Sequence, residues 1–179
     1  NYKRASNGQA LRQAQVFDAL LNSRDGNKET PLLHACRRGE VSTAKLLLER
    51  GARLDLRDAA GCTIFIKAVQ GNSIQVLQLL YSYVRSRALR QAPDRVVGWT
   101  PLHYAASLGD IDTVHFLLDH GASPYARCKK KEQTPLDLAL NKETRTVITD
   151  FIKQEPAQIL LEERKGTRLA QLWIGQHEA

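Results

Sequence analysis

The chain has 179 residues, of which 42% are hydrophobic and 25% are charged, and its formal net charge is +7. This length allows one domain with a sizeable core, and the composition is that of an ordinary globular protein, which excludes a disordered or fibrous chain. No apolar run approaches membrane-spanning length and no signal peptide is visible, so we expect no transmembrane segment in this stretch.

Residues 1–24 precede a repeated motif and contain a helical apolar stripe. Val16, Phe17, Leu20 and Leu21 recur at the spacing of one helix face. We therefore predict an N-terminal capping helix that covers the first repeat.

Four later segments begin alike, at Thr30, Thr63, Thr100 and Thr134, so the intervals between them are 33, 37 and 34 residues. They read TPLLHA, TIFIKA, TPLHYA and TPLDLA. Threonine suits a helix N-cap and proline suits the first helical position, so each motif predicts the start of a helix. The second, fifth and sixth residues after each threonine form an apolar face that we assign to the core: Leu32, Ala35, Cys36, Phe65, Ala68, Val69, Leu102, Ala105, Ala106, Leu136, Ala139 and Leu140.

A second apolar run follows each opening and predicts a second helix. These runs lie in residues 41–48, 74–80, 111–118 and 147–152. Gly51 and Gly121 come after the first and third runs, where a glycine suits a left-handed C-cap. Between the paired helices, Gly39 and Gly109 stand nine residues after their threonines, and Asn72 takes the same place in the second repeat. Asparagine tolerates a positive φ best among non-glycine residues, so we predict a left-handed Asn72.

A period near 33 residues with this opening resembles the ankyrin repeat, over roughly residues 25–153. The resemblance implies an all-α solenoid of stacked helix-turn-helix units, with short β-hairpin fingers between repeats and helical caps. We therefore expect repeats that open at residues 30, 63, 100 and 134. A helical cap or linker over residues 154–179 is expected to follow.

Two repeats depart from the family pattern. The second lacks a Gly-Ala ending, and Tyr81 to Val97 replaces it, so we predict a second helix prolonged to about Ala88 and then an irregular loop. The fourth has Asp137 where the family motif has histidine, which predicts a terminal repeat with a more polar outer face.

Three cysteines, Cys36, Cys62 and Cys128, are odd in number and lack the spacing of metal ligands. They fit a reducing compartment, in which a buried cysteine acts as a small hydrophobic residue, so we expect an intracellular protein, cytoplasmic or nuclear. Because the chain begins at Asn1 rather than methionine, we expect it to be a piece of a longer protein whose targeting signals lie elsewhere.

The sequence contains no phosphate-cradling glycine loop, no HExxH motif and no nucleophile elbow. His103, inside TPLH, is implied by the resemblance to be a structural residue that ties neighbouring repeats by hydrogen bonds. We therefore expect a protein that is not an enzyme and has no cofactor or metal site. An enzyme in the rest of the parent polypeptide stays an open possibility.

The resemblance implies a concave groove lined by the fourth, seventh and eighth residues after each threonine. These include His34, Arg37, Arg38, Lys67, Gln70, Tyr104, Ser107 and Leu108. Val97 and Trp99 add apolar surface on the finger side, and tryptophan and arginine are common at binding hot spots. The basic end and the apolar middle predict a monomeric adaptor or scaffold that binds an acidic and apolar protein or peptide.

An alternative function uses the fingertips. Lys129, Lys130 and Lys131 lie at a predicted fingertip. With Arg57, Arg127 and the Arg85–Arg90 stretch they are predicted to form a basic rim that suits nucleic acid or anionic lipid. No aromatic residues are interleaved with these lysines and no nucleic-acid motif is present, so we rank this alternative second.

Overall fold

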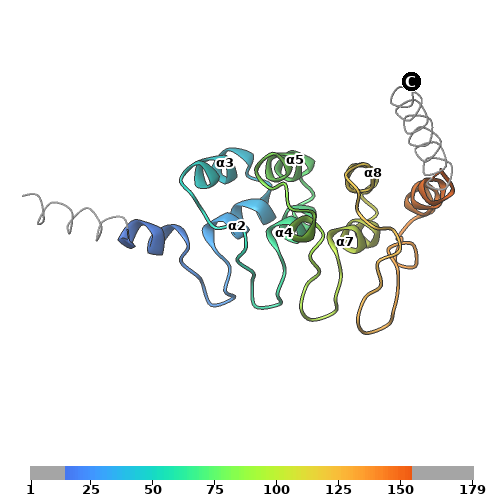
Figure 1. Cartoon of the computed structure of the whole chain (residues 1–179), viewed down its shortest axis with the longest axis horizontal. Helices are drawn as coiled ribbons and strands as arrows, with labels where there is room; N and C mark the ends of the chain where they lie inside the picture. The colour runs from blue at the N-terminus through green and yellow to red at the C-terminus, as the bar shows by residue number, and fades with distance from the viewer. Residues whose placement is uncertain (1–14, 155–179) are drawn as a thin grey trace, which may run out of the picture.

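The computed structural model describes residues 15–154, in which the helices form two rows (Figure 1). The first helices of three repeats form one row: α2 (Pro31–Arg38), α4 (Ile64–Gln70) and α7 (Pro101–Leu108). Their second helices form the other row: α3 (Val41–Glu49), α5 (Ile74–Tyr83) and α8 (Ile111–Asp119). Helix α4 packs between α2 and α7, and α3 packs on α5. The all-α solenoid is therefore confirmed.

Long loops, here called fingers 1 to 4, extend from the first row on one side (Figure 1). They cover residues 22–29, 52–62, 91–99 and 122–133. The expected β-hairpin strands are absent from residues 15–154, because each finger is closed by very few backbone hydrogen bonds, such as Asp94 N–H to the Trp99 carbonyl at 2.9 Å. Neighbouring fingers are joined by single backbone bonds instead, for example Lys129 N–H to the Val97 carbonyl at 2.9 Å.

The predicted helix starts follow from threonine capping. The hydroxyl oxygens of Thr30 and Thr63 each accept a hydrogen bond at 3.3 Å, from the backbone N–H of Leu33 and Ile66 respectively. The core between the two rows is apolar and continuous across the repeats. All three cysteines are buried free thiols, as expected.

The turns between paired helices have the predicted left-handed backbone. Gly39 and Gly109 have φ values of 72° and 71°, and Asn72 has a φ of 49° in the corresponding turn. Gly71, just before it, has an ordinary φ but no room for a side chain: an added Cβ would lie 2.6 Å from the carbonyl oxygens of Cys36 and Arg37. The close approach of α4 to α2 therefore requires glycine at position 71 and positive φ at position 72.

We expect Asn72→Gly to leave stability nearly unchanged and Asn72→Val to lower it by about 1–2 kcal/mol, because a β-branched residue is strained at positive φ. Urea unfolding of both variants would measure this difference. Equal midpoints for the two would contradict the strain.

Helix α5 does not reach Ala88, so that prediction was wrong. The helix ends at Tyr83, and a separate short helix, α6 (Arg87–Arg90), follows. The guanidinium of Arg90 donates to the carbonyl oxygens of Val84 at 2.5 Å and Tyr81 at 3.1 Å. Because these bonds satisfy the free carbonyls at the helix end, the chain turns back there instead of continuing as a helix.

The fourth repeat lacks its predicted first helix. Residues 135–138 form a turn, and the next helix covers residues 142–154. The Asp137 carboxylate accepts bonds from both the N–H and the hydroxyl of Thr134 at 2.8 Å, and the N–H of Leu140 donates to the Ala106 carbonyl at 3.0 Å. Leu140, which we assigned to the core, is 68% exposed as a result.

The N-terminal helix covers residues 15–21 but does not bury its predicted stripe. Leu21 packs on the core, whereas Val16, Phe17 and Leu20 are exposed. The remainder of the predicted cap, residues 1–14, and the predicted C-terminal cap or linker beyond residue 154 lie outside the described residues.

Candidate partner-binding surface

Seven of the predicted binding residues lie on α2, α4 and α7, and together they define what is here called the inner surface: His34, Arg37, Arg38, Gln70, Tyr104, Ser107 and Leu108. Its end at α2 is basic, since Arg37 and Arg38 are both exposed. The Arg38 guanidinium lies 3.7 Å from the Glu40 carboxylate, and that of Arg37 lies 3.5 Å from Glu29. Such loose pairs leave both cations accessible to a partner.

Lys67 was wrongly placed among the binding residues, because it is only 6% exposed. Its ammonium donates to Glu29 at 2.5 Å and lies 2.7 Å from the Asp58 carboxylate. Burial alone would lower the pKa of Lys67, but the bonds to Asp58 and Glu29 outweigh it and raise the pKa above 10.5. Lys67 is therefore a structural cation that ties fingers 1 and 2 to α4.

The middle of the inner surface is aromatic and aliphatic. The half-buried Trp99 ring is nearly parallel to His103 and meets Tyr104 edge-on, with ring centroids 5.2 Å apart. The Tyr104 hydroxyl donates to Asp94 at 3.3 Å, and burial raises the pKa of this tyrosine. Leu108, one helical turn further, is 48% exposed. An apolar anchor thus lies beside a fixed aromatic wall.

Finger 3 holds that wall in place through Asp94. One carboxylate oxygen accepts bonds from the N–H groups of Val96 and Val97 at 2.8 and 2.7 Å, and the other accepts from the N–H of Trp99 at 3.0 Å. Val97 is half-buried in this closed loop. The sequence carries a signal for this role, because Asp94 stands shortly before the opening Thr100.

His103 has the structural role implied by the resemblance. Its Nε2–H donates to the Gln133 carbonyl of finger 4 at 3.1 Å, which leaves Nδ1 to accept the Thr100 N–H at 3.1 Å. Burial lowers the pKa of His103, which keeps the imidazole neutral in this arrangement.

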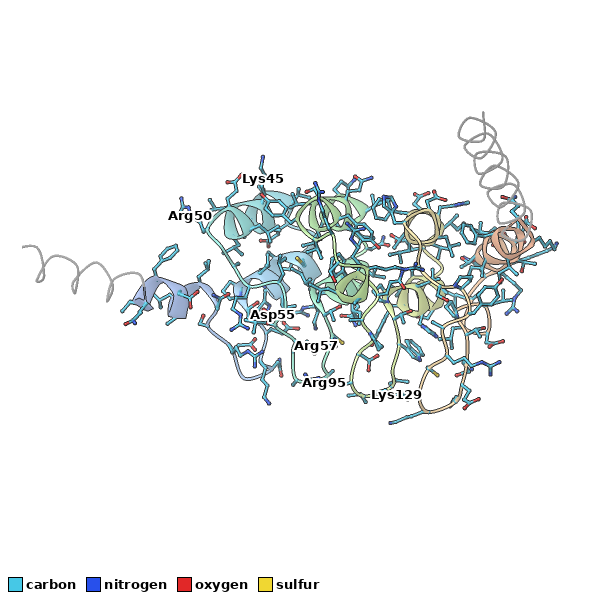
Figure 2. All side chains as sticks on the ribbon, viewed as in Figure 1. Lys45, Arg50, Asp55, Arg57, Arg95 and Lys129 are labelled. Atoms are coloured by element: carbon cyan, nitrogen blue, oxygen red, sulfur yellow. The ribbon has the colours of Figure 1, made fainter. Side chains whose placement is uncertain are left out.

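At the far end of the fingers, Lys129, Lys130 and Lys131 are exposed, as predicted. Of the cations in finger 4, Arg127 pairs with Glu132 at 3.5 Å, whereas the three lysines have no carboxylate partner within residues 15–154. Figure 2 shows Lys129 on the finger side of the molecule, away from Lys45 and Arg50.

One cluster was missed by sequence reasoning. Asp25, Glu29 and His34 offer metal-type ligand atoms that all lie within 4.8 Å of one another. However, each oxygen of Glu29 already faces a cation, Lys67 at 2.5 Å and Arg37 at 3.5 Å. Because these cations already balance the carboxylate charge, we assign the cluster to the structural ion-pair network rather than to a metal.

Within the part of the chain that the structure describes, no helix has both the length and the apolar character needed to cross a membrane. Family comparison matches residues 5–92 to ankyrin repeats in three copies and residues 97–129 to one further ankyrin repeat. Together with the stacked helix pairs and the threonine-capped openings, these matches show that the chain belongs to the ankyrin repeat family.

Several proteins of known name are similar to it. The tyrosine-protein kinase HTK16 of Hydra vulgaris is 34% identical over 141 residues, which cover 79% of this chain and 18% of the kinase. The ankyrin repeat protein nuc-2 of Neurospora crassa is 40% identical over 95 residues, 52% of this chain and 8% of nuc-2. The 2-5A-dependent ribonuclease of Mus musculus is 45% identical over 75 residues, 41% of this chain and 10% of the enzyme. This chain therefore spans less than a fifth of each relative.

Proposed function

We propose that this chain is a non-catalytic protein-interaction module that binds an acidic and apolar peptide or protein surface on its inner surface. The observation that carries the proposal is Leu108, exposed beside the fixed Trp99–Tyr104 wall. Tryptophan and tyrosine are among the residue types enriched at interface hot spots, and Leu108 adds exposed apolar area beside them. Arg37 and Arg38, accessible at the end of the inner surface formed by α2, supply the complement for acidic residues.

Two further observations support a binding role over catalysis. Burial raises the pKa of Tyr104 on the inner surface and lowers that of the buried His103 next to it in the chain, and both side chains are held in structural hydrogen bonds. Repeats in this family generally mediate protein–protein interaction. The match to HTK16 covers only a small part of that kinase, which is consistent with repeats that supply binding rather than chemistry.

The test compares two leucines of equal exposure. Leu108 on the inner surface is 48% exposed. Leu46 lies on α3, in the row of second helices, here called the outer row, and is 49% exposed. Leu46→Glu is therefore a matched control for Leu108→Glu. Proteins captured by the chain would be identified by mass spectrometry, and the affinity of each purified partner for the three forms would be measured. We expect Leu108→Glu to weaken binding by at least about tenfold, the effect of losing an interface anchor, and Leu46→Glu to leave it unchanged.

Variants of the aromatic residues test the same proposal in the same binding assay. Trp99→Ala and Tyr104→Ala are each expected to weaken binding by about 1–3 kcal/mol, whereas Arg37→Ala should mainly slow association and reduce its salt dependence. The alternative function, binding of nucleic acid or anionic lipid, predicts the reverse. In that case replacing Lys129, Lys130 and Lys131 with Glu would abolish binding, and Leu108→Glu would have no effect.

A further inference from the structure

A polar cavity of about 340 Å³ lies among fingers 1, 2 and 3, away from the inner surface. Its charged lining consists of Arg24 and Lys28 from finger 1, Asp55, Arg57 and Asp58 from finger 2, and Arg95 from finger 3. Figure 2 shows Arg57 and Arg95 close together on the finger side, far from Lys45 and Arg50 on the outer row.

The two carboxylates of this lining are already paired with cations from outside it. Arg53 donates to both oxygens of Asp55, at 3.1 and 2.7 Å, and this bidentate bond lowers the pKa of Asp55. The Lys67 ammonium lies 2.7 Å from Asp58. By contrast, none of the four cations of the lining makes a carboxylate pair within residues 15–154. The cavity therefore carries an excess of positive charge, although Arg24 interacts electrostatically with Asp55 and helps to lower its pKa.

The backbone holds two of these cations, Arg57 and Arg24, in place before any ligand arrives. One terminal nitrogen of Arg57 donates to the carbonyls of Gly61 and Pro93, at 2.6 and 2.7 Å, and Arg24 donates to the Arg57 carbonyl at 3.1 Å. Gly61, with a φ of 79°, lets Arg95 cross finger 2, because an added Cβ would lie 2.4 Å from Arg95 Cγ. Side chains that are already ordered lose less conformational entropy when they bind.

We propose that this cavity binds the phosphate of a phosphorylated serine or threonine in the protein partner. A phosphate monoester carries close to two negative charges at neutral pH and accepts the forked hydrogen bonds that arginine offers. The inference rests on the proposed function, since the same chain segment would continue onto the inner surface. Lys67 connects the two places, because it contacts Asp58 of the cavity wall and belongs to α4.

The lining favours a single phosphate over a nucleic-acid backbone. No aromatic residue lines the cavity, so bases have no stacking surface there.

The test uses a fluorescent peptide library with a central phosphoserine between random residues, together with its unphosphorylated twin. By anisotropy we expect the phosphorylated library to bind at least about tenfold more tightly, in the range of a charge-assisted bidentate contact. The double variant Lys28→Gln, Arg95→Gln should lose this preference. The double variant Lys45→Gln, Arg50→Gln, which removes the same charge from the outer row, should keep it. Arg95→Gln alone provides a milder variant, and circular dichroism verifies the fold of each.

Three results would overturn the inference: equal binding of both libraries, an unchanged preference in the Lys28→Gln, Arg95→Gln variant, or tighter binding of single-stranded oligothymidylate than of the phosphorylated library. Inorganic phosphate, added as a competitor, separates the free anion from the peptide-borne one, and we expect it to compete far more weakly than the library. If the phosphate preference fails while Leu108→Glu still weakens partner binding, the proposed function stands. If Leu108→Glu has no effect while the phosphorylated library binds at the cavity, the proposed function fails instead.

Discussion

Replacing Lys67 with methionine is expected to lower the free energy of unfolding by about 3–5 kcal/mol, the usual cost of removing one partner from a buried ion pair. Glu29 and Asp58 would keep their negative charges without this cation, and their side chains are only 6% and 8% exposed. Methionine fills a similar volume, so the loss would report charge rather than packing. Urea unfolding at pH 7 measures it.

Two variants give this experiment its controls. Lys45→Met removes an exposed lysine that pairs loosely with Glu49 at 4.0 Å, and should change stability by less than about 1 kcal/mol. The triple variant Lys67→Met, Glu29→Gln, Asp58→Asn removes all three charges together and should recover much of the loss. A triple variant as unstable as Lys67→Met would show that the cost lies in packing or hydrogen bonding instead.

The same network predicts a response to alkali. The folded-state pKa of Lys67 is raised above 10.5, so its contribution to stability is fully present below pH 10.5 and is lost as the pH rises through the folded-state value. The stability difference between the native chain and Lys67→Met should therefore be constant near neutral pH and narrow above pH 10.5.

The repeat pattern predicts much of this fold because it is local. A threonine that caps a helix and a glycine or asparagine that turns it act within a few residues of their own positions, and the structure confirms them at Thr30, Gly39 and Asn72. The same local register places Arg37, Tyr104 and Leu108 on the first helices of their repeats, whereas Lys67, four places after Thr63, is buried.

The mistaken predictions involve partners that are distant in sequence. Lys67 occupies an inner-surface position, but Glu29 belongs to finger 1, and no local pattern indicates that pairing. Helix α5 stops early because Arg90, seven residues beyond its last residue, bonds back to its free carbonyls. Leu140 is exposed because its backbone N–H bonds to Ala106 of the previous repeat. At Arg90 and Leu140 a bond between segments overrides local helix propensity. Lys67 stays in its predicted helix, and its ion pairs with the fingers bury it.

The cavity among fingers 1, 2 and 3 also depends on residues that are distant in the sequence. Arg24, Arg57 and Arg95 are about one repeat apart in the sequence, and stacking of the repeats is what brings them together. The excess charge there also depends on which carboxylates are neutralised, and Arg53 and Lys67 make those pairs from outside the cavity. Counting charges along the chain identifies neither the cluster of arginines nor the carboxylates that are neutralised.

The second large effect is expected at Asp94, where Asp94→Ala should cost about 3 kcal/mol because it leaves several backbone N–H groups of finger 3 without an acceptor. Asp94 is only 2% exposed, so water cannot replace the carboxylate without opening the loop. Asp150→Ala, which removes an exposed aspartate that lies 3.5 Å from Lys153, is the matched control and should change stability by less than about 1 kcal/mol.

The contribution of Asp94 to stability is also expected to depend on pH. Burial alone would raise the pKa of Asp94, but the backbone N–H bonds outweigh it, and the net pKa lies below 3.8. The contribution of Asp94 is therefore present above the unfolded-state pKa near 3.8 and is lost as the pH falls through the folded-state value, so native chain and Asp94→Ala should converge in stability only in strong acid. Because Asp94 also orders Trp99 and bonds to Tyr104, the variant should speed amide exchange at Val97 and Trp99 and weaken partner binding. Unchanged exchange in finger 3, together with a urea midpoint equal to that of Asp150→Ala, would show that the loop is held by its neighbours rather than by Asp94.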